Sequence, residues 1–131
     1  MKINKNHAGA AAEQLAATFL MQKGLKLVVP NYHCRFGEID LVMKDGNTLV
    51  FVEVRSRSND TFGSASVIIT KQKQQKLIAT AQHFLQMHQD CDCCFDPILM
   101  NKAHLDHIEW LRNVFETKSA YHVYTHVRHY L

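Results

Sequence analysis

Two runs of alternating side chains, joined by the sequence Lys44-Asp45-Gly46-Asn47, constrain the fold of this chain more than any other feature. Residues 37–43 and 48–57 are rich in aliphatic and β-branched residues, and a glycine-containing turn between two such runs predicts a β-hairpin. Because side chains alternate across a strand, the valines of the second run are predicted to share one face. The opposite face would carry Phe51, Glu53, Arg55 and Arg57.

The first run of the hairpin follows the same rule. It separates Ile39 and Leu41 on one face from Glu38, Asp40 and Val42 on the other. If Asp45-Gly46 is the two-residue turn, Asp40 lies diagonally from Glu53, and if Gly46-Asn47 is the turn, the two acids face each other directly. In either register they share a face at roughly 5–8 Å. Pattern alone leaves open a solvated face with cross-strand ion pairs.

The remaining elements predict an α/β fold. Helical spacing of apolar residues predicts a first helix over about 8–23, ended by Gly24, and a second over about 71–87, capped by Thr70. Short strands are predicted over 25–29, ended by Pro30, and over 95–100, interrupted near its start by Pro97. The type of the segment 108–115 stays open. This order predicts a mixed central sheet with a helix on each face.

Composition narrows the class of protein. The chain has 131 residues, of which 47% are hydrophobic and 21% charged, as expected of one folded domain. Its net charge of +3 is compatible with nucleic acid but does not single it out. Three of the four cysteines crowd into residues 91–94, so we expect reduced thiols and a cytoplasmic protein rather than a disulfide scaffold. No run reaches the roughly 20 apolar residues of a membrane span.

At the hairpin the sequence resembles the YraN-like family of bacterial proteins. The matching pieces are Gly37-Glu38-Ile39-Asp40-Leu41-Val42 and Val50-Phe51-Val52-Glu53-Val54-Arg55-Ser56-Arg57. Gly9 with Glu13, Lys71-Gln72 and Phe95-Asp96 support the match in the family's order, although Cys94 stands where the family has arginine. The resemblance implies the restriction-endonuclease-like fold of the PD-(D/E)XK nuclease superfamily. It covers roughly residues 8–115, so we expect an endonuclease-like domain at 1–116 and an extension at 117–131 that packs on it or binds a partner.

The resemblance also implies roles for individual residues. Asp40 and Glu53 would be the motif acids and, with the Val54 carbonyl, would hold Mg²⁺ or Mn²⁺. Arg55 stands in the superfamily's lysine position, where it cannot act as a base because guanidinium does not deprotonate in proteins. Glu13 would orient water or a second ion, and Arg55 and Lys71 would steady the phosphate. The remaining DNA contacts would come from Arg35, Arg57, Lys71 and Gln72.

The function implied by the resemblance is metal-dependent hydrolysis of DNA phosphodiester bonds, with structured or branched DNA as the substrate by analogy. Many enzymes of the superfamily act as dimers, which leaves open a homodimer. The alternative is a non-catalytic nucleic-acid-binding or assembly protein that retains the fold. Such a binder needs only a basic surface, so its affinity should depend steeply on salt and survive loss of either acid.

Two further groups of residues were weighed as sites. His88, Cys91, Cys93 and Cys94 place four soft ligands close together, but adjacent cysteines are not the usual zinc spacing, so a surface loop between helix and strand is the favoured interpretation. His122, His126 and His129 recur at helical spacing in the extension, as do Val123, Val127 and Leu131, which is equally typical of a packing stripe.

Overall fold

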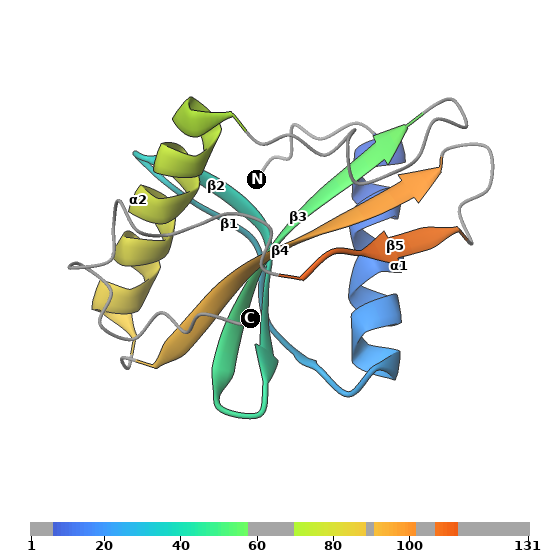
Figure 1. Ribbon diagram of the computed structural model, residues 1–131, viewed down its shortest axis with the longest axis horizontal. Helices are drawn as coiled ribbons and strands as arrows, with labels where there is room; N and C mark the ends of the chain where they lie inside the picture. The colour runs from blue at the N-terminus through green and yellow to red at the C-terminus, as the bar shows by residue number, and fades with distance from the viewer. Residues whose placement is uncertain (1–6, 58–69, 89–90, 102–106, 113–131) are drawn as a thin grey trace.

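The computed structural model describes residues 7–57, 70–88, 91–101 and 107–112. Their order along the chain is helix, three strands, helix and two strands (Figure 1). The elements are α1 (His7–Gln22), β1 (Lys26–Cys34), β2 (Gly37–Asp45), β3 (Thr48–Arg57), α2 (Lys71–Met87), β4 (Asp92–Asn101) and β5 (Ile108–Trp110). The predicted 117–131 extension and its three histidines lie outside the described residues.

The five strands form one mixed sheet in the order β1-β2-β3-β4-β5. All neighbours are antiparallel except β3 and β4, which run parallel because the chain crosses over through α2 between them. Figure 1 shows α1 and α2 on opposite sides of this strongly twisted sheet. The α/β class and the helix on each face are confirmed, and the arrangement is consistent with a restriction-endonuclease-like fold.

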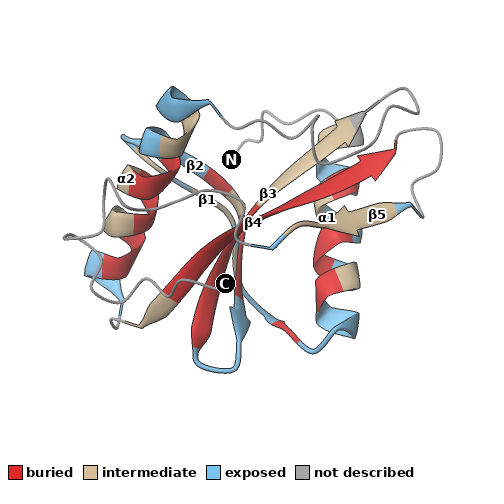
Figure 2. Ribbon diagram, in the orientation of Figure 1, coloured by how far each residue is buried: buried red, intermediate tan, exposed pale blue. Residues whose placement is uncertain are grey.

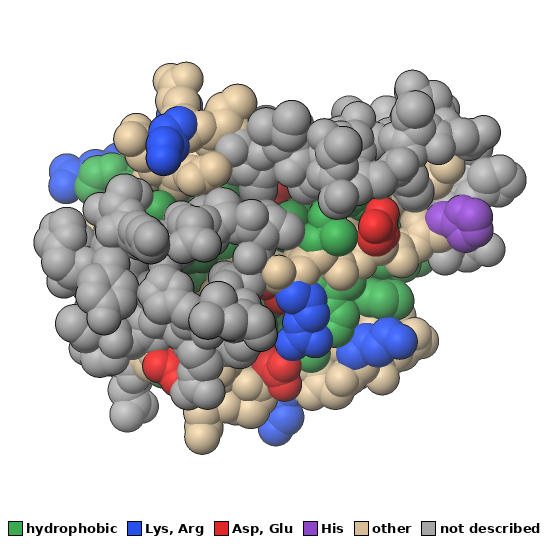
Figure 3. Space-filling view, viewed as in Figure 1, with side chains coloured by type: hydrophobic (Ala, Val, Ile, Leu, Met, Phe, Trp, Pro, Cys, Tyr) green, Lys and Arg blue, Asp and Glu red, His purple; other side chains and the backbone are tan. Residues whose placement is uncertain are grey.

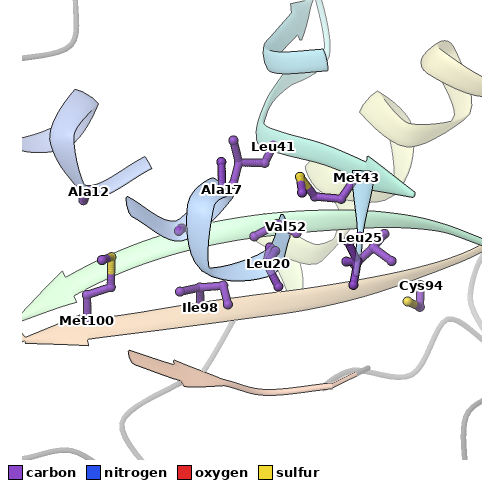
Figure 4. Close-up of a cluster of buried hydrophobic side chains, with 12 residues drawn as sticks. Ala12, Ala17, Leu20, Leu25, Leu41, Met43, Val52, Cys94, Ile98 and Met100 are labelled. Atoms are coloured by element: carbon purple, nitrogen blue, oxygen red, sulfur yellow. The ribbon is translucent and has the colours of Figure 1, made fainter. Parts of the chain in front are cut away.

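Each face of the sheet has its own buried cluster (Figure 2). Between α2 and the sheet, the aromatic rings of Phe51, Phe84 and Phe95 pack with aliphatic side chains. Between α1 and the sheet, Ala12, Ala16 and Ala17 contribute small side chains to the second cluster. Figure 4 labels Ala12 and Ala17 together with larger members of this cluster. Small residues let a helix backbone approach closely, so α1 lies against the β2 and β3 strands that carry the acids.

The hairpin adopts the second of the two predicted registers. Asp45 pairs with Thr48, so Gly46-Asn47 forms the turn, and Gly46 has a φ of +62°, which favours glycine. The β2–β3 pairing ends at Leu41 and Val52. Strict alternation breaks just beyond that point. Ile39 packs on the α2 face although Leu41 packs on the α1 face, so the prediction that these two share a face is wrong.

Both prolines lie inside strands that were predicted to be shorter. β1 continues through Pro30 to Cys34, because an edge strand has one side on which no partner needs the missing N–H. β4 begins at Asp92, and its short pairing with β5 involves residues 98–100, just beyond Pro97. The carbonyl of Pro97 accepts from Leu111 N at 3.0 Å. Tertiary pairing therefore overrides the local proline signal at both places.

The helix ends follow the sequence signals. Thr70 caps α2 by accepting a hydrogen bond from Lys73 N through Oγ1 at 3.1 Å. Gly24, with a φ of +101°, follows α1 and its N–H donates to the Met21 carbonyl. In the described part of the chain, neither helix is both long and apolar enough to cross a membrane.

Candidate functional site

Asp40 lies where strands β2 and β3 stop pairing. Beyond the last pair, the backbone N–H of Val54 donates to Asp40 Oδ2 at 2.8 Å, so a carboxylate takes the place of a backbone acceptor. The N–H and C=O of one strand residue point to the same side of the strand, which also directs the Val54 carbonyl toward β2. The Asp40 carboxylate is thus oriented beside the β3 backbone, on the side to which the Val54 carbonyl oxygen also points.

Glu53 is the second acid of this pair. Continuing the observed register places it opposite Asp40, and its side chain is only 15% exposed. Two cationic groups approach its Oε2 atom: Arg55 Nε at 3.5 Å and Lys73 Nζ at 3.6 Å. Glu53 therefore sits in a small cluster of two acids and two bases at the start of α2.

Burial raises the pKa of Glu53 above the usual value of 4.5. Lys73 opposes this rise, the negative charge of Asp40 adds to it, and Arg55 opposes it more weakly. The two bases do not fully compensate the cost of removing the carboxylate from water. A further positive charge between Asp40 and Glu53 would lower that cost.

This raised pKa predicts a pH-dependent difference between the wild type and Glu53→Gln. Between the pKa of Glu53 in the unfolded chain and its raised pKa in the folded protein, the folded wild type binds more protons. Its free energy of unfolding therefore falls as pH rises through this window. The neutral glutamine lacks this loss. In EDTA, the urea midpoint of the variant relative to the wild type should therefore increase from about pH 4 to about pH 7.

A matched control is Glu38→Gln, which changes an exposed acid on the same hairpin. Its urea midpoint relative to the wild type should stay nearly level over the same pH range, since the Glu38 side chain is exposed in the folded protein. If the urea midpoint of Glu53→Gln relative to the wild type stayed level or decreased as pH rises, the charged form of Glu53 would not destabilise the folded protein.

The structure assigns the helix contact to Lys73, a residue that the sequence interpretation passed over. Lys71 and Gln72 are exposed in the first turn of α2, whereas Lys73 reaches Glu53. A signal for this was present: Lys73 precedes the buried Leu77 by four residues, and residues four apart share a helix face. Lys73 lies two residues after Lys71 and one after Gln72, in the same first turn of the helix.

The other predicted site residues are spread more widely. Glu13 is half-buried on α1, which covers the opposite face of the sheet from α2. Arg35 is exposed in the turn between β1 and β2. Arg57 ends β3, and its side chain lies outside the described residues. The predicted residues that the structure brings together are Asp40, Glu53, Val54 and Arg55.

The donor set of the acid pair fits a hard divalent cation. Mg²⁺ prefers oxygen ligands and is commonly held by one or two carboxylates, with water and substrate oxygens completing its shell. Asp40, Glu53 and the Val54 carbonyl supply such oxygens. Within the described ranges no group of three or more His, Cys, Asp or Glu side chains could hold a metal, so Glu13 does not form a three-acid group with this pair.

The cysteine segment does not form the surface loop that was expected. Cys93 and Cys94 are buried in β4 and, as consecutive strand residues, pack on opposite faces of the sheet. Burial raises the pKa of Cys93 to about 12 and also raises the pKa of Cys94. Neutral thiols that point away from each other are poor zinc ligands. They serve the two cores instead.

Comparison with known proteins places the chain in a family. The pattern of "Uncharacterised protein family UPF0102" matches residues 12–100, which include both acids, strands β1 to β3, and β4 up to Met100. The chain belongs to the UPF0102 family. This confirms the YraN-like resemblance that the hairpin residues indicated.

Individual UPF0102 proteins align along most of their length. A UPF0102 protein of Methylobacillus flagellatus is 55% identical over 107 residues, covering 82% of this chain and 95% of the relative. One from Nitrosomonas europaea is 52% identical over 109 residues, covering 82% and 92%. One from Nitrosococcus oceani is 48% identical over 115 residues, covering 85% and 93%. The alignments therefore cover most of this chain and nearly all of each relative.

The described surface of this UPF0102 protein carries charges of both signs. Figure 3 shows Lys and Arg side chains beside Asp and Glu side chains and exposed hydrophobic ones on one face. A broad positive field would attract any polyanion. The face in Figure 3 instead mixes both signs.

Proposed function

We propose that this chain is a divalent-metal-dependent nuclease that hydrolyses phosphodiester bonds of DNA. The observation that carries the proposal is the largely buried Glu53 carboxylate, which lies against Arg55 and Lys73. Besides burial, the negative charge of Asp40 acts on the same carboxylate and raises its pKa. Two like charges are costly side by side unless a cation lies between them. The two partly buried acids are therefore suited to bind a cation, and the neighbouring basic side chains are suited to bind a phosphate.

Each residue has a distinct role in this proposal. Asp40, Glu53 and the Val54 carbonyl would hold Mg²⁺ or Mn²⁺. When bound there, such an ion would supply a water ligand of lowered pKa and would neutralise charge on the scissile phosphate. Val54 N–H fixes the orientation of Asp40 through its 2.8 Å bond, so that the carboxylate needs little rearrangement to ligate.

The two bases would bind the phosphate rather than move a proton. Arg55 stays charged at any physiological pH and presents several N–H donors, which suits the stabilisation of negative charge that develops on phosphate oxygens. Lys73 approaches the same Oε2 atom of Glu53 and is proposed here for the role that the sequence analysis gave to Lys71. When a phosphate enters, both side chains can exchange their Glu53 contact for a phosphate oxygen, because they are 30% and 39% exposed.

The DNA contacts outside the acid pair would come from exposed groups on the α2 side. Lys71 and Gln72 at the start of α2, and Arg35 in the β1–β2 turn, are exposed, and Arg57 follows at the end of β3. Such contacts to phosphates position a substrate without reading its sequence. Structured or branched DNA is proposed as substrate from the family resemblance.

The proposal is tested by cleavage of labelled single-stranded, duplex and four-way-junction DNA by the full-length wild-type protein. We expect cleavage of at least one substrate in Mg²⁺ or Mn²⁺ and none in EDTA. If the protein binds these DNAs with a steep salt dependence but cuts none of them in either metal, the non-catalytic binding protein becomes the better account.

A further inference from the structure

An exposed aromatic side chain in the turn between β1 and β2 stands beside an arginine of the same turn and a histidine of α2. Phe36 is 40% exposed, although large apolar side chains are normally withdrawn from water. The guanidinium of Arg35 lies over its ring, with Cζ 4.8 Å from the centroid. The ring of His83, on α2, meets that of Phe36 edge-on at 6.1 Å.

This turn is held firmly against α2. Gly37 has a φ of +148°, and a Cβ there would come within 3.1 Å of Thr80 Oγ1, so the β2 backbone approaches the helix as closely as glycine allows. Next to it, the Tyr32 hydroxyl is hydrogen-bonded to His83 Nδ1, and the Tyr32 ring packs edge-on against the buried Phe84. Phe36 is therefore presented to solvent by a rigid support.

Helix α2 connects this turn to the acid pair. Lys73, Lys76, Thr80 and His83 recur at the three- and four-residue spacing of one helix face. Lys73 contacts Glu53 at one end of that row, and His83 contacts Phe36 at the other. Ten residues of helix span about 15 Å. Along β2, Phe36 precedes Asp40 by four residues, or no more than about 14 Å.

The charges around Phe36 favour an anionic ligand. Arg35 and Lys76 are exposed cations, and His33 is an exposed histidine on β1. Glu38 is an acidic neighbour, paired across the strands with His33. An accessible aromatic ring supplies a face for stacking, and neighbouring cations supply contacts for phosphates, which together match a single strand of nucleic acid.

We propose that Arg35, Phe36, Lys76 and His83, here called the stacking platform, bind an unpaired nucleotide whose strand continues to Asp40 and Glu53. The proposal rests on the nuclease function above and narrows its substrate to DNA that contains a single-stranded segment. A base within a duplex is stacked on both sides and cannot offer a face to Phe36. The platform therefore distinguishes unpaired strands from duplex without reading their sequence.

The test is the binding of a fluorescein-labelled oligo(dT) to the full-length protein, measured by anisotropy in EDTA so that cleavage plays no part. Phe36→Leu should weaken binding by about 5- to 100-fold, whereas Phe36→Tyr should bind nearly as well as the wild type. Met21→Ala, which trims a 45% exposed side chain on α1, across the sheet from the platform, serves as the matched control and should not change binding. An oligo(U) arm distinguishes DNA from RNA.

Three results would overturn the platform. One is unchanged affinity of Phe36→Leu for oligo(dT). Another is an equal loss of affinity for blunt duplex DNA, which would indicate a general effect. The third is wild-type binding to an abasic strand as tight as to oligo(dT), which would leave no role for stacking. Because these measurements need no metal or turnover, they separate failure of the platform from failure of the nuclease proposal.

Discussion

Replacing Asp40 by asparagine or Glu53 by glutamine should lower metal-dependent DNA cleavage by about a hundred-fold or more. Each change removes one negative charge from a pair that is proposed to hold a single ion. The ion then binds less tightly and orients its water less well. The measurement is the initial rate on the best-cleaved DNA substrate, in Mg²⁺ and in Mn²⁺, with the folded state of each variant checked by circular dichroism.

Asp45→Asn is the matched control for this loss. Asp45 lies on the same strand as Asp40 but at the turn, where it is 47% exposed and 3.8 Å from Arg112. An exposed ion pair contributes little, so this variant should keep wild-type cleavage. If the Asp40 and Glu53 variants also kept wild-type rates, any observed cleavage would have to come from another site or from a contaminating enzyme.

Replacing Phe84 by alanine should lower the free energy of unfolding by about 3–5 kcal/mol. Phe84 is 1% exposed, and its ring meets those of Tyr32, Phe51 and His88 at centroid distances of 5.1, 6.0 and 4.0 Å. Removing it leaves a cavity between α2 and the sheet that neighbouring rings cannot fill without moving. Urea unfolding followed by circular dichroism gives the value.

Two variants calibrate that result. Phe84→Leu keeps most of the buried volume and should lose clearly less than the alanine variant. Met87→Ala changes an exposed residue of the same helix and should stay within about 0.5 kcal/mol of the wild type. A loss below about 1 kcal/mol for Phe84→Ala would mean that α2 does not depend on this ring for its position, and hence that Lys73 and His83 are not fixed by it.

The hairpin could be predicted because its information is local. Alternating valines and a glycine in the turn predict the two strands. The sequence leaves open only whether Gly46-Asn47 or Asp45-Gly46 forms the turn, and the structure has Gly46-Asn47. The α2 helix could also be predicted from sequence, since Thr70 caps it and apolar residues follow at helical spacing. Asp40, Glu53 and Arg55 were therefore identified as neighbours from pattern and resemblance alone.

Features set by distant parts of the chain could not be predicted in this way. The local signals predict a strand end at Pro30 and an interruption at Pro97, although the position of each strand in the sheet decides whether a missing N–H matters. The break in alternation at Asp40 depends on a side chain binding the backbone of the next strand. The packing of α2 on the sheet decides which face of the helix lies toward Glu53. The contact made by Lys73 could therefore not be predicted from local sequence.

The central claim is that Asp40 and Glu53 hold one divalent ion, and Mn²⁺ binding followed by electron paramagnetic resonance tests it most directly. The titration uses the metal-free, full-length protein without DNA, alongside Asp40→Asn, Glu53→Gln and the Asp45→Asn control. We predict one Mn²⁺ per chain for the wild type and for the control, and binding weakened at least about ten-fold in both site variants. One Mn²⁺ bound equally tightly by all four proteins would contradict the claim, as would the absence of any binding to the wild type.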